Sequence, residues 1–164
     1  MLLLRAFIWI IAAGLIGAAA SAQSTSVAFG SVKTDPKLPV EVTADTLDVN
    51  QEDGSAEFKG NVLVGQGEMR LSAQRVLVIY NQGKSTIQRM EATGGVVLVN
   101  GPDAAEAERA DYSIDTGVIV MTGDVLLTQG ANALTSEKMT VNLTTGTAQM
   151  AGRVKTILNP DGGN

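Results

Sequence analysis

The stretch A-E-F-K-G-N-V-L-V at residues 56–64 alternates apolar and polar side chains on both sides of a glycine. Successive side chains of a β-strand point to opposite faces, so the apolar residues of this stretch share one face. Glu57, Lys59 and Asn61 share the other face. Alternation of this kind predicts a strand with one buried and one solvent-exposed face.

This glycine-centred pattern is part of a longer repeat that occurs four times along the chain. Each copy opens with a small residue followed by an acidic or amide residue. The opening pairs are Ala44-Asp45, Ala73-Gln74, Ala107-Glu108 and Ser136-Glu137, and the glycines are Gly60, Gly94, Gly123 and Gly152. Copies begin 29, 34 and 29 residues apart, and the longer spacing is due to turn-like residues at 81–84. Each copy predicts two strands, with turns at residues 50–54, 115–117 and 144–146.

The apolar faces of these strands must be buried against one another. We therefore predict an all-β fold: an antiparallel β-jellyroll, a folded-over β-roll with open ends, built from about four two-strand repeats. The repeated glycines either lie inside and leave room there, or permit a bulge or bend in the strands. The alternation places the following residues on the inward face: Phe58, Val62, Val64, Val76, Val78, Leu98, Tyr112, Ile114, Met121, Val125, Met139 and Val141.

The ends of the chain differ from its repetitive middle. Residues 1–22 have the features of a cleaved signal peptide: Arg5, an apolar run over 7–17, and small residues before a cleavage position after Ala22. Retention of this segment as a membrane anchor is the alternative. The polar residues 23–38 are interpreted as a flexible leader, residues 39–160 as the β-domain and residues 161–164 as a tail.

The composition argues against several classes of function. The chain has no cysteine and no histidine, so the Ser-His and Cys-His nucleophile pairs and the commonest metal ligand are absent. Its formal net charge is −5, which does not suit nucleic acid. We therefore predict no catalytic residue, no metal site, no cofactor and no nucleic-acid partner.

Three stretches carry a resemblance to a known family: V-E-V-T-A-D at 40–45, F-K-G-N-V-L-V-G-Q-G at 58–67 and L-S-A-Q-R-V at 71–76. They are similar to the OstA-like family of periplasmic lipopolysaccharide-transport bridge proteins, and the likeness extends over residues 39–160. The resemblance implies an exported periplasmic β-jellyroll that holds lipid A acyl chains in an apolar slot. Matching positions imply that Val40, Val42, Leu98, Tyr112 and Ile114 line that slot.

The resemblance also implies partners. The N-terminal edge of the sheet would pair with an LptC-like component of the inner membrane. The C-terminal edge would pair with an LptD-like component of the outer membrane, and copies of the chain could stack head to tail.

Three other interpretations remain open. A secreted structural or adhesive β-solenoid would have a dry interior filled by side chains, whereas co-purified lipid would favour the carrier. A retained N-terminal segment would make the protein a membrane-anchored, LptC-like component. A glycosidase would need a carboxylate pair such as Asp45 and Asp48, or Glu52 and Asp53. The position of Asp45 recurs in the other copies on an outer face, which favours solvated charge over catalysis.

Overall fold

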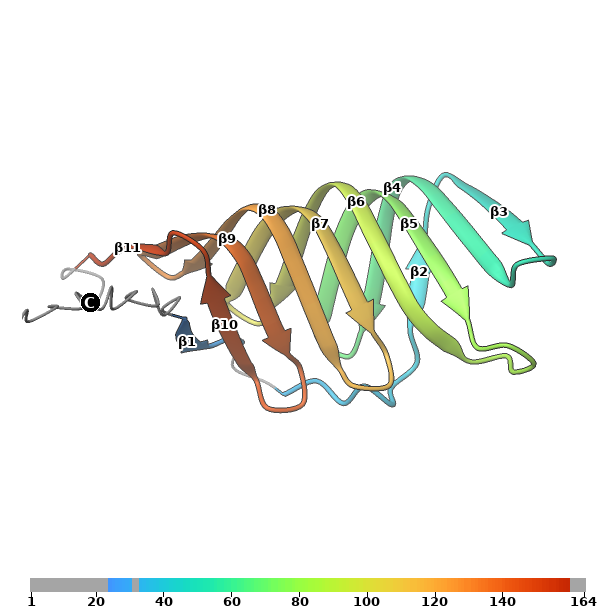
Figure 1. The fold of residues 1–164 in the computed structure, drawn as a ribbon, viewed down its shortest axis with the longest axis horizontal. Coiled ribbons are helices and arrows are strands. Elements are labelled where there is room, and N and C mark those ends of the chain that lie inside the picture. The colour runs from blue at the N-terminus through green and yellow to red at the C-terminus, as the bar shows by residue number, and fades with distance from the viewer. Residues whose placement is uncertain (1–23, 31–32, 160–164) are drawn as a thin grey trace, which may run out of the picture.

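The computed structural model describes residues 24–30 and 33–159, and these residues form one antiparallel sheet of eleven strands (Figure 1). The strands are β1 (Thr25–Ala28), β2 (Glu41–Thr43), β3 (Thr46–Asn50), β4 (Ser55–Gln66), β5 (Met69–Tyr80), β6 (Ile87–Asn100), β7 (Asp103–Ser113), β8 (Val118–Gln129), β9 (Asn132–Asn142), β10 (Thr147–Ala151) and β11 (Lys155–Ile157). The proposed signal peptide at 1–22 and the tail at 161–164 lie outside the described residues. The predicted all-β, antiparallel fold is confirmed.

Strands β4 to β10 follow one another as a meander, each paired with its neighbour in the sequence. At one end, β2 and β3 both pair with β4, while at the other end β10 and β11 both pair with β9. The first strand, β1, adds to the outer side of β10. The turns predicted at residues 50–54, 115–117 and 144–146 connect strands, and residues 81–86 form the loop between β5 and β6.

A line of β-bulges folds this single sheet into two facing walls (Figure 1). The register shifts in each long strand pair, between Lys59 and Val62 in β4 and at the corresponding place in the next four pairs, and the β5–β6 pair has a second shift between Ile79 and Tyr80. The first wall contains β1, β3, β10 and the adjoining halves of β4 to β9. The second wall contains β2, β11 and the remaining halves. A bulge bends its strand and increases the local twist, which closes one wall over the other.

The repeated glycines form these bulges and do not enlarge the interior. Gly60, Gly94, Gly123 and Gly152 have φ values between 78° and 86°, and each is followed by a second residue with positive φ. A Cβ atom on Gly94 would lie 2.8 Å from the Cβ of Gln74. A Cβ atom added to Gly60, Gly123 or Gly152 would lie 3.0, 2.8 or 2.8 Å from the Cβ of Asp45, Glu108 or Glu137, respectively. The acidic or amide residue that opens each repeat thus packs over that repeat's own glycine, which explains the constant spacing between them.

The interior between the walls is apolar. Ten of the residues predicted to face inward are buried there: Val62, Val64, Val76, Val78, Leu98, Tyr112, Met121, Val125, Met139 and Val141. The other four, Val40, Val42, Phe58 and Ile114, are partly buried and pack against this cluster. The inward orientation derived from alternation therefore holds in both walls.

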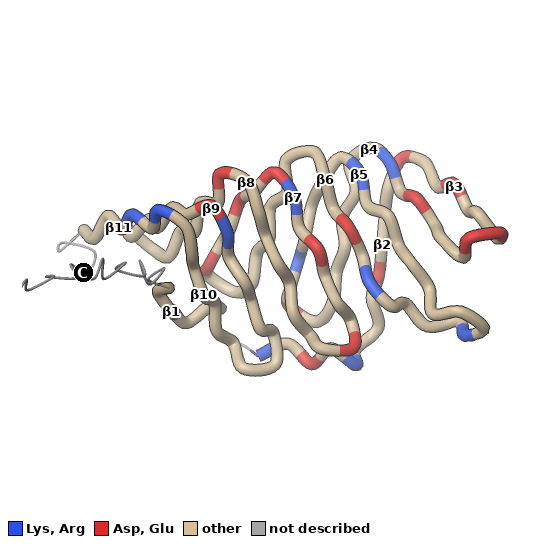
Figure 2. Tube along the Cα trace, viewed as in Figure 1, with Lys and Arg blue, Asp and Glu red and all other residues tan. Residues whose placement is uncertain are grey.

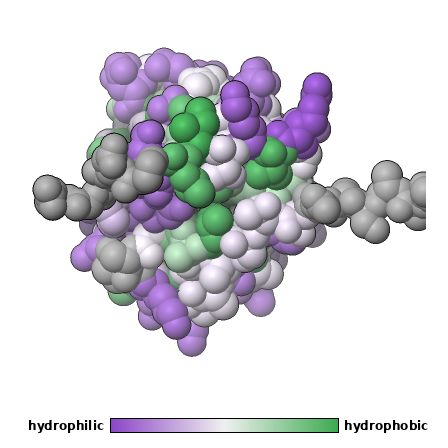
Figure 3. All heavy atoms as spheres, turned by 90° about the vertical axis from the view of Figure 1, so that its left-hand side faces the viewer, coloured by the Kyte–Doolittle hydropathy of each residue, from purple (hydrophilic) through white to green (hydrophobic). Residues whose placement is uncertain are grey.

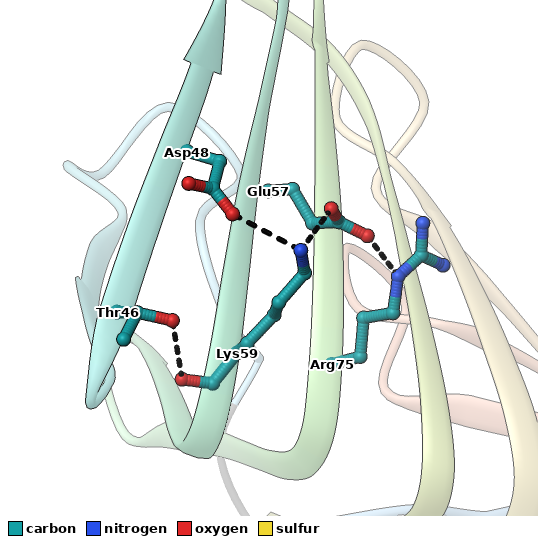
Figure 4. A network of polar contacts seen from close by, with 5 residues as sticks. All are labelled: Thr46, Asp48, Glu57, Lys59 and Arg75. Atoms are coloured by element: carbon teal, nitrogen blue, oxygen red, sulfur yellow. Dashed lines mark hydrogen bonds and ion pairs between the residues drawn. The ribbon is translucent and has the colours of Figure 1, made fainter.

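Charged residues of both signs are distributed along the strands (Figure 2). Lys59 lies between Asp48 at 3.0 Å and Glu57 at 2.8 Å, and Glu57 also pairs with Arg75 (Figure 4). Both neighbours lower the pKa of Glu57, chiefly through the hydrogen bond from Lys59. Exposed pairs of this kind contribute little to stability. Their position confirms that alternate residues face solvent.

The polar segment at 23–38 is not a flexible leader throughout. Within it, Thr25–Ala28 forms β1 on the open edge of β10, and Phe29 is fully buried in the apolar cluster. The free backbone groups of an edge strand can form hydrogen bonds with another strand. Burial of a large apolar side chain also stabilises the fold. The alternate Val27 and Phe29 were the sequence signal for this, in a stretch otherwise too polar to suggest a strand.

The bulge between β5 and β6 offers a matched test of this architecture. Gly94 and Gly95 both have positive φ, but a Cβ on Gly95 would meet nothing within 4 Å. Both Gly94→Ala and Gly95→Ala introduce backbone strain, and only Gly94→Ala also forces Gln74 to move. Overpacking costs about 1–3 kcal/mol. We expect urea denaturation to show that Gly94→Ala lowers the free energy of unfolding by about 1 kcal/mol or more beyond Gly95→Ala. Equal losses would contradict the packing of Gln74 over Gly94.

Candidate functional site

The candidate site is the apolar slot between the two walls. Its lining comes from alternate residues of every long strand, so it extends from β3 and β4 at one end to β9 and β10 at the other. The bulges close it along one side. Along the other side, two rows of turns lie opposite each other: the first edge, with turns at 51–54, 81–86, 114–117 and 143–146, and the second edge, with turns at 67–68, 101–102 and 130–131. We call the line between these edges the seam.

Side chains fill the slot in this structure. Val76, Leu98, Met121, Met139 and Val141 each expose less than 1% of their surface. A ligand therefore could not simply occupy an existing cavity among them. The walls or the side chains must move apart to admit it.

The interior is rich in methionine, which suits such movement. Five methionines are buried in the cluster: Met69, Met90, Met121, Met139 and Met150. Methionine is unbranched and flexible, and it adapts to gaps of irregular shape more readily than other apolar residues. The lining can therefore repack at lower cost than one made of β-branched side chains.

One polar contact crosses the slot. The Tyr112 hydroxyl, on the first wall, donates a hydrogen bond to Oε1 of Gln66 at the end of β4 in the second wall. Burial raises the pKa of Tyr112 to about 12, against a smaller opposing effect of the bond to Gln66. Gln66 was not predicted as a site residue, although it follows Val62 and Val64 in the same inward phase.

The Gln66 side chain also holds the N-terminal segment across the seam. Its Nε2 donates to the carbonyl oxygens of Pro36 and Leu38, each at 2.9 Å. On the first edge, the amide of Thr34 donates to the carbonyl of Leu143 at 3.1 Å. Residues 33–39, which we call the strap, thus lie along the seam between β1 and β2 (Figure 1).

The chain just before the strap also contacts both edges. The Phe29 amide donates to the carbonyl of Gly146 on the first edge at 3.0 Å. The Gly30 amide donates at 2.7 Å to a carboxylate oxygen of Asp103 on the second edge, and the same oxygen accepts from Gln129 at 2.9 Å. Phe29 therefore reaches the interior from the seam side.

Apolar surface is exposed at both ends of the roll. Leu47 and Val49 of β3 lie opposite the inward-facing Phe58 and Ala56, yet they expose 52% and 63% of their surface because no further strand covers them. At the other end, Ile157 and Leu158 expose 50% and 68%. Figure 3 shows apolar surface on this second end, beside hydrophilic residues and residues of intermediate hydropathy. The lining thus continues to an uncovered end beside β3.

Two of the carboxylates considered for catalysis, Asp45 and Asp48, have other contacts. Asp45 packs over Gly60 and accepts a hydrogen bond from Asn61, while Asp48 pairs with Lys59. Among residues 24–30 and 33–159, no group of three or more carboxylates could hold a metal ion. The same residues include no helix of the length and apolarity needed to cross a membrane.

Comparison with known proteins adds a family and a fold. The family described as "LptA/(LptD N-terminal domain) LPS transport protein" matches residues 41–147. An uncharacterised protein of Rhizobium meliloti (strain 1021) is 31% identical over 116 residues, which cover 66% of this chain and 62% of that relative. The crystal structure of LptH from Pseudomonas aeruginosa, described as the LptA-homologous periplasmic component of its lipopolysaccharide transport device, has a TM-score of 0.69. It shares 17% identity over 77% of this chain and 99% of LptH.

These findings confirm three expectations from the sequence. The structural match confirms the β-jellyroll fold. The family match confirms the resemblance to OstA-like proteins, and the matched family is one of transport proteins rather than enzymes. With more than half of its residues matched, the chain belongs to the LptA/LptD N-terminal-domain family of lipopolysaccharide-transport proteins.

Proposed function

We propose that this protein is a periplasmic lipopolysaccharide carrier, exported by a cleaved signal peptide at residues 1–22, that holds lipid A acyl chains in its slot. The observation that carries the proposal is the apolar lining, which runs the length of an open-ended roll in a member of this transport family. The fourteen inward-facing residues from Val40 to Val141 would contact the chains. The sugar and phosphate groups would remain in water.

The energetics of acyl chains suit such a slot. Each methylene group moved out of water contributes about 0.8 kcal/mol, so a chain of about twelve carbons contributes roughly 10 kcal/mol. Several chains could not cross an aqueous compartment unprotected. Apolar contacts have no preferred direction, so a chain can slide along the lining without breaking specific bonds.

A filled interior is expected of a structural β-solenoid, and it is equally expected of a carrier that holds no lipid. Three observations support the carrier. The family transports lipopolysaccharide, the lining is rich in flexible methionine, and the lining remains uncovered at the β3 end. A filled slot also has a clear use in a carrier, since an empty apolar cavity would cost stability whenever lipid is absent.

The two ends of the sheet suit β-strand addition by partners. At one end β2 and β3 each pair on one side only, and at the other end β1 and β11 do the same. Unpaired strand edges are sites for pairing with another chain. We propose that an LptC-like component pairs at the β2 and β3 end and an LptD-like component at the β1 and β11 end. Copies of the chain would stack in the same orientation.

A charge in the slot tests lipid binding directly. Val42 faces the interior opposite Val64, whereas its neighbour Thr43 is exposed on the outer face. We expect Val42→Asp to weaken binding of purified lipopolysaccharide by about tenfold or more, because an unpaired carboxylate would lie beside the acyl chains. Thr43→Asp is the matched control and should bind as the wild type does. Equal affinities for the two folded variants would count against the slot.

The exposed end of the slot allows a test of stacking. Leu47 would be covered by the next copy, and its substitution leaves the buried cluster intact because the side chain is already exposed. We expect the mass measured by light scattering to rise with protein concentration for the wild type and to remain that of a monomer for Leu47→Asp. Glu52→Gln, in the adjacent turn, should behave as the wild type. Wild-type behaviour of Leu47→Asp would show that this end is not the joint.

A further inference from the structure

We propose that the strap, residues 33–39, is a displaceable cover that closes the seam of the slot when lipid is absent, and that Gln66 is its latch. This inference rests on the proposed function, since it concerns how lipid gains access to the same slot. The inference adds a segment that moves, the strap, and a residue with a specific role, Gln66. An apolar lining alone would require neither of them.

The strap joins the two edges of the roll. Thr34 is bonded to Leu143 on the first edge, and Pro36 packs against Gly117 of the same edge. On the second edge, Gln66 binds the carbonyl groups of Pro36 and Leu38, and Leu38 lies next to Gly67. While these contacts hold, the seam is covered along this part of the roll.

The strap is held by few bonds and is not part of the sheet. Two amides of the strap bond within the strap itself. The Lys37 amide donates a hydrogen bond to the Asp35 side chain, and the Leu38 amide donates one to the Asp35 carbonyl oxygen. Thr34 is buried, yet its hydroxyl has no hydrogen-bond partner in the structure. A buried hydroxyl without a partner opposes the closed position, because it would regain a bond to water on release. The closed strap is thus a local state of low stability.

A lipid with a large polar head needs the seam to open. Acyl chains can lie between the walls, but a phosphorylated sugar cannot be buried there without a large desolvation cost. If the head group stays in water while the chains slide from end to end, the link between them must pass along the seam. The strap occupies that path, so it must lift as the lipid passes.

Gln66 connects the slot to the strap. The same side chain accepts a hydrogen bond from Tyr112 across the slot and donates two bonds to the strap. An acyl chain that separates Tyr112 from Gln66 would move the amide away from Pro36 and Leu38. Filling the slot and releasing the strap are therefore coupled through one residue.

A reversible disulfide tests the movement. A Cβ on Gly117 would lie 3.5 Å from the Cβ of Pro36, which is within the range for a disulfide. The chain has no cysteine, so the Pro36→Cys/Gly117→Cys variant would hold only the engineered pair. We expect the oxidised variant to bind purified lipopolysaccharide at least about tenfold more slowly than the same protein after reduction. The Gly117→Cys single variant controls for the positive φ of Gly117, and both single variants should be insensitive to oxidant.

The outcomes separate the two proposals. If the wild type and the reduced variant bind and oxidation changes nothing, the strap proposal is overturned while the carrier stands. If the wild type fails to bind lipopolysaccharide, the proposed function fails and the strap proposal fails with it.

Thiol labelling provides a second measurement that needs no cross-link. Thr34→Cys places a small thiol at the buried position, and Lys33→Cys places one at its exposed neighbour. We expect saturating lipopolysaccharide to speed maleimide labelling at position 34 by about tenfold or more and to leave position 33 unchanged. Protection of position 34 that persists with lipid bound would overturn the proposal.

Discussion

A single sheet that must bury its own apolar face determines this structure. No helix or second sheet covers that face among the described residues, so the sheet folds along a line of bulges until its two halves meet. Each bulge depends on a glycine in the left-handed region, packed beneath the acidic or amide side chain that opens its own repeat. The same geometry leaves the ends of the sheet without partners and produces a seam opposite the bulges. Both the slot and its openings therefore follow from one constraint.

The proposed lipid carrier must meet two opposed requirements. It must shield fatty chains from water when loaded, and it must remain folded and soluble when empty. The filled interior meets the second requirement, because buried methionine and Phe29 take the place that lipid would occupy. The first requirement then needs an interior that can open without losing the sheet. The strands pair side by side within each wall, so their hydrogen bonds do not depend on the distance between the walls at the seam. The walls can therefore move apart while the strand pairing stays intact.

Much of the fold could be predicted from the sequence because one face of each strand is apolar and the repeats keep a constant spacing. Alternation correctly oriented twelve of the fourteen lining residues, including Tyr112 and Met139 in different repeats, and the family resemblance added Val40 and Val42. Alternation could not decide the role of the glycines, because glycine has no side chain whose polarity would indicate which face of the strand it occupies. It also missed Gln66, whose polar side chain contradicts a purely apolar lining. The N-terminal segment was missed because the burial of Phe29, its single aromatic residue, depends on contacts with residues distant in the sequence.

The central claim is that lipid lies between the walls, and photocrosslinking tests it most directly. A photoreactive phenylalanine analogue would replace Tyr112, whose side chain points into the slot, or Asp111, its neighbour on the opposite face of β7. In cells that export the protein, the account predicts a lipopolysaccharide adduct from position 112 and none from position 111. An adduct from position 111 alone would place the lipid on the outer face and contradict the account.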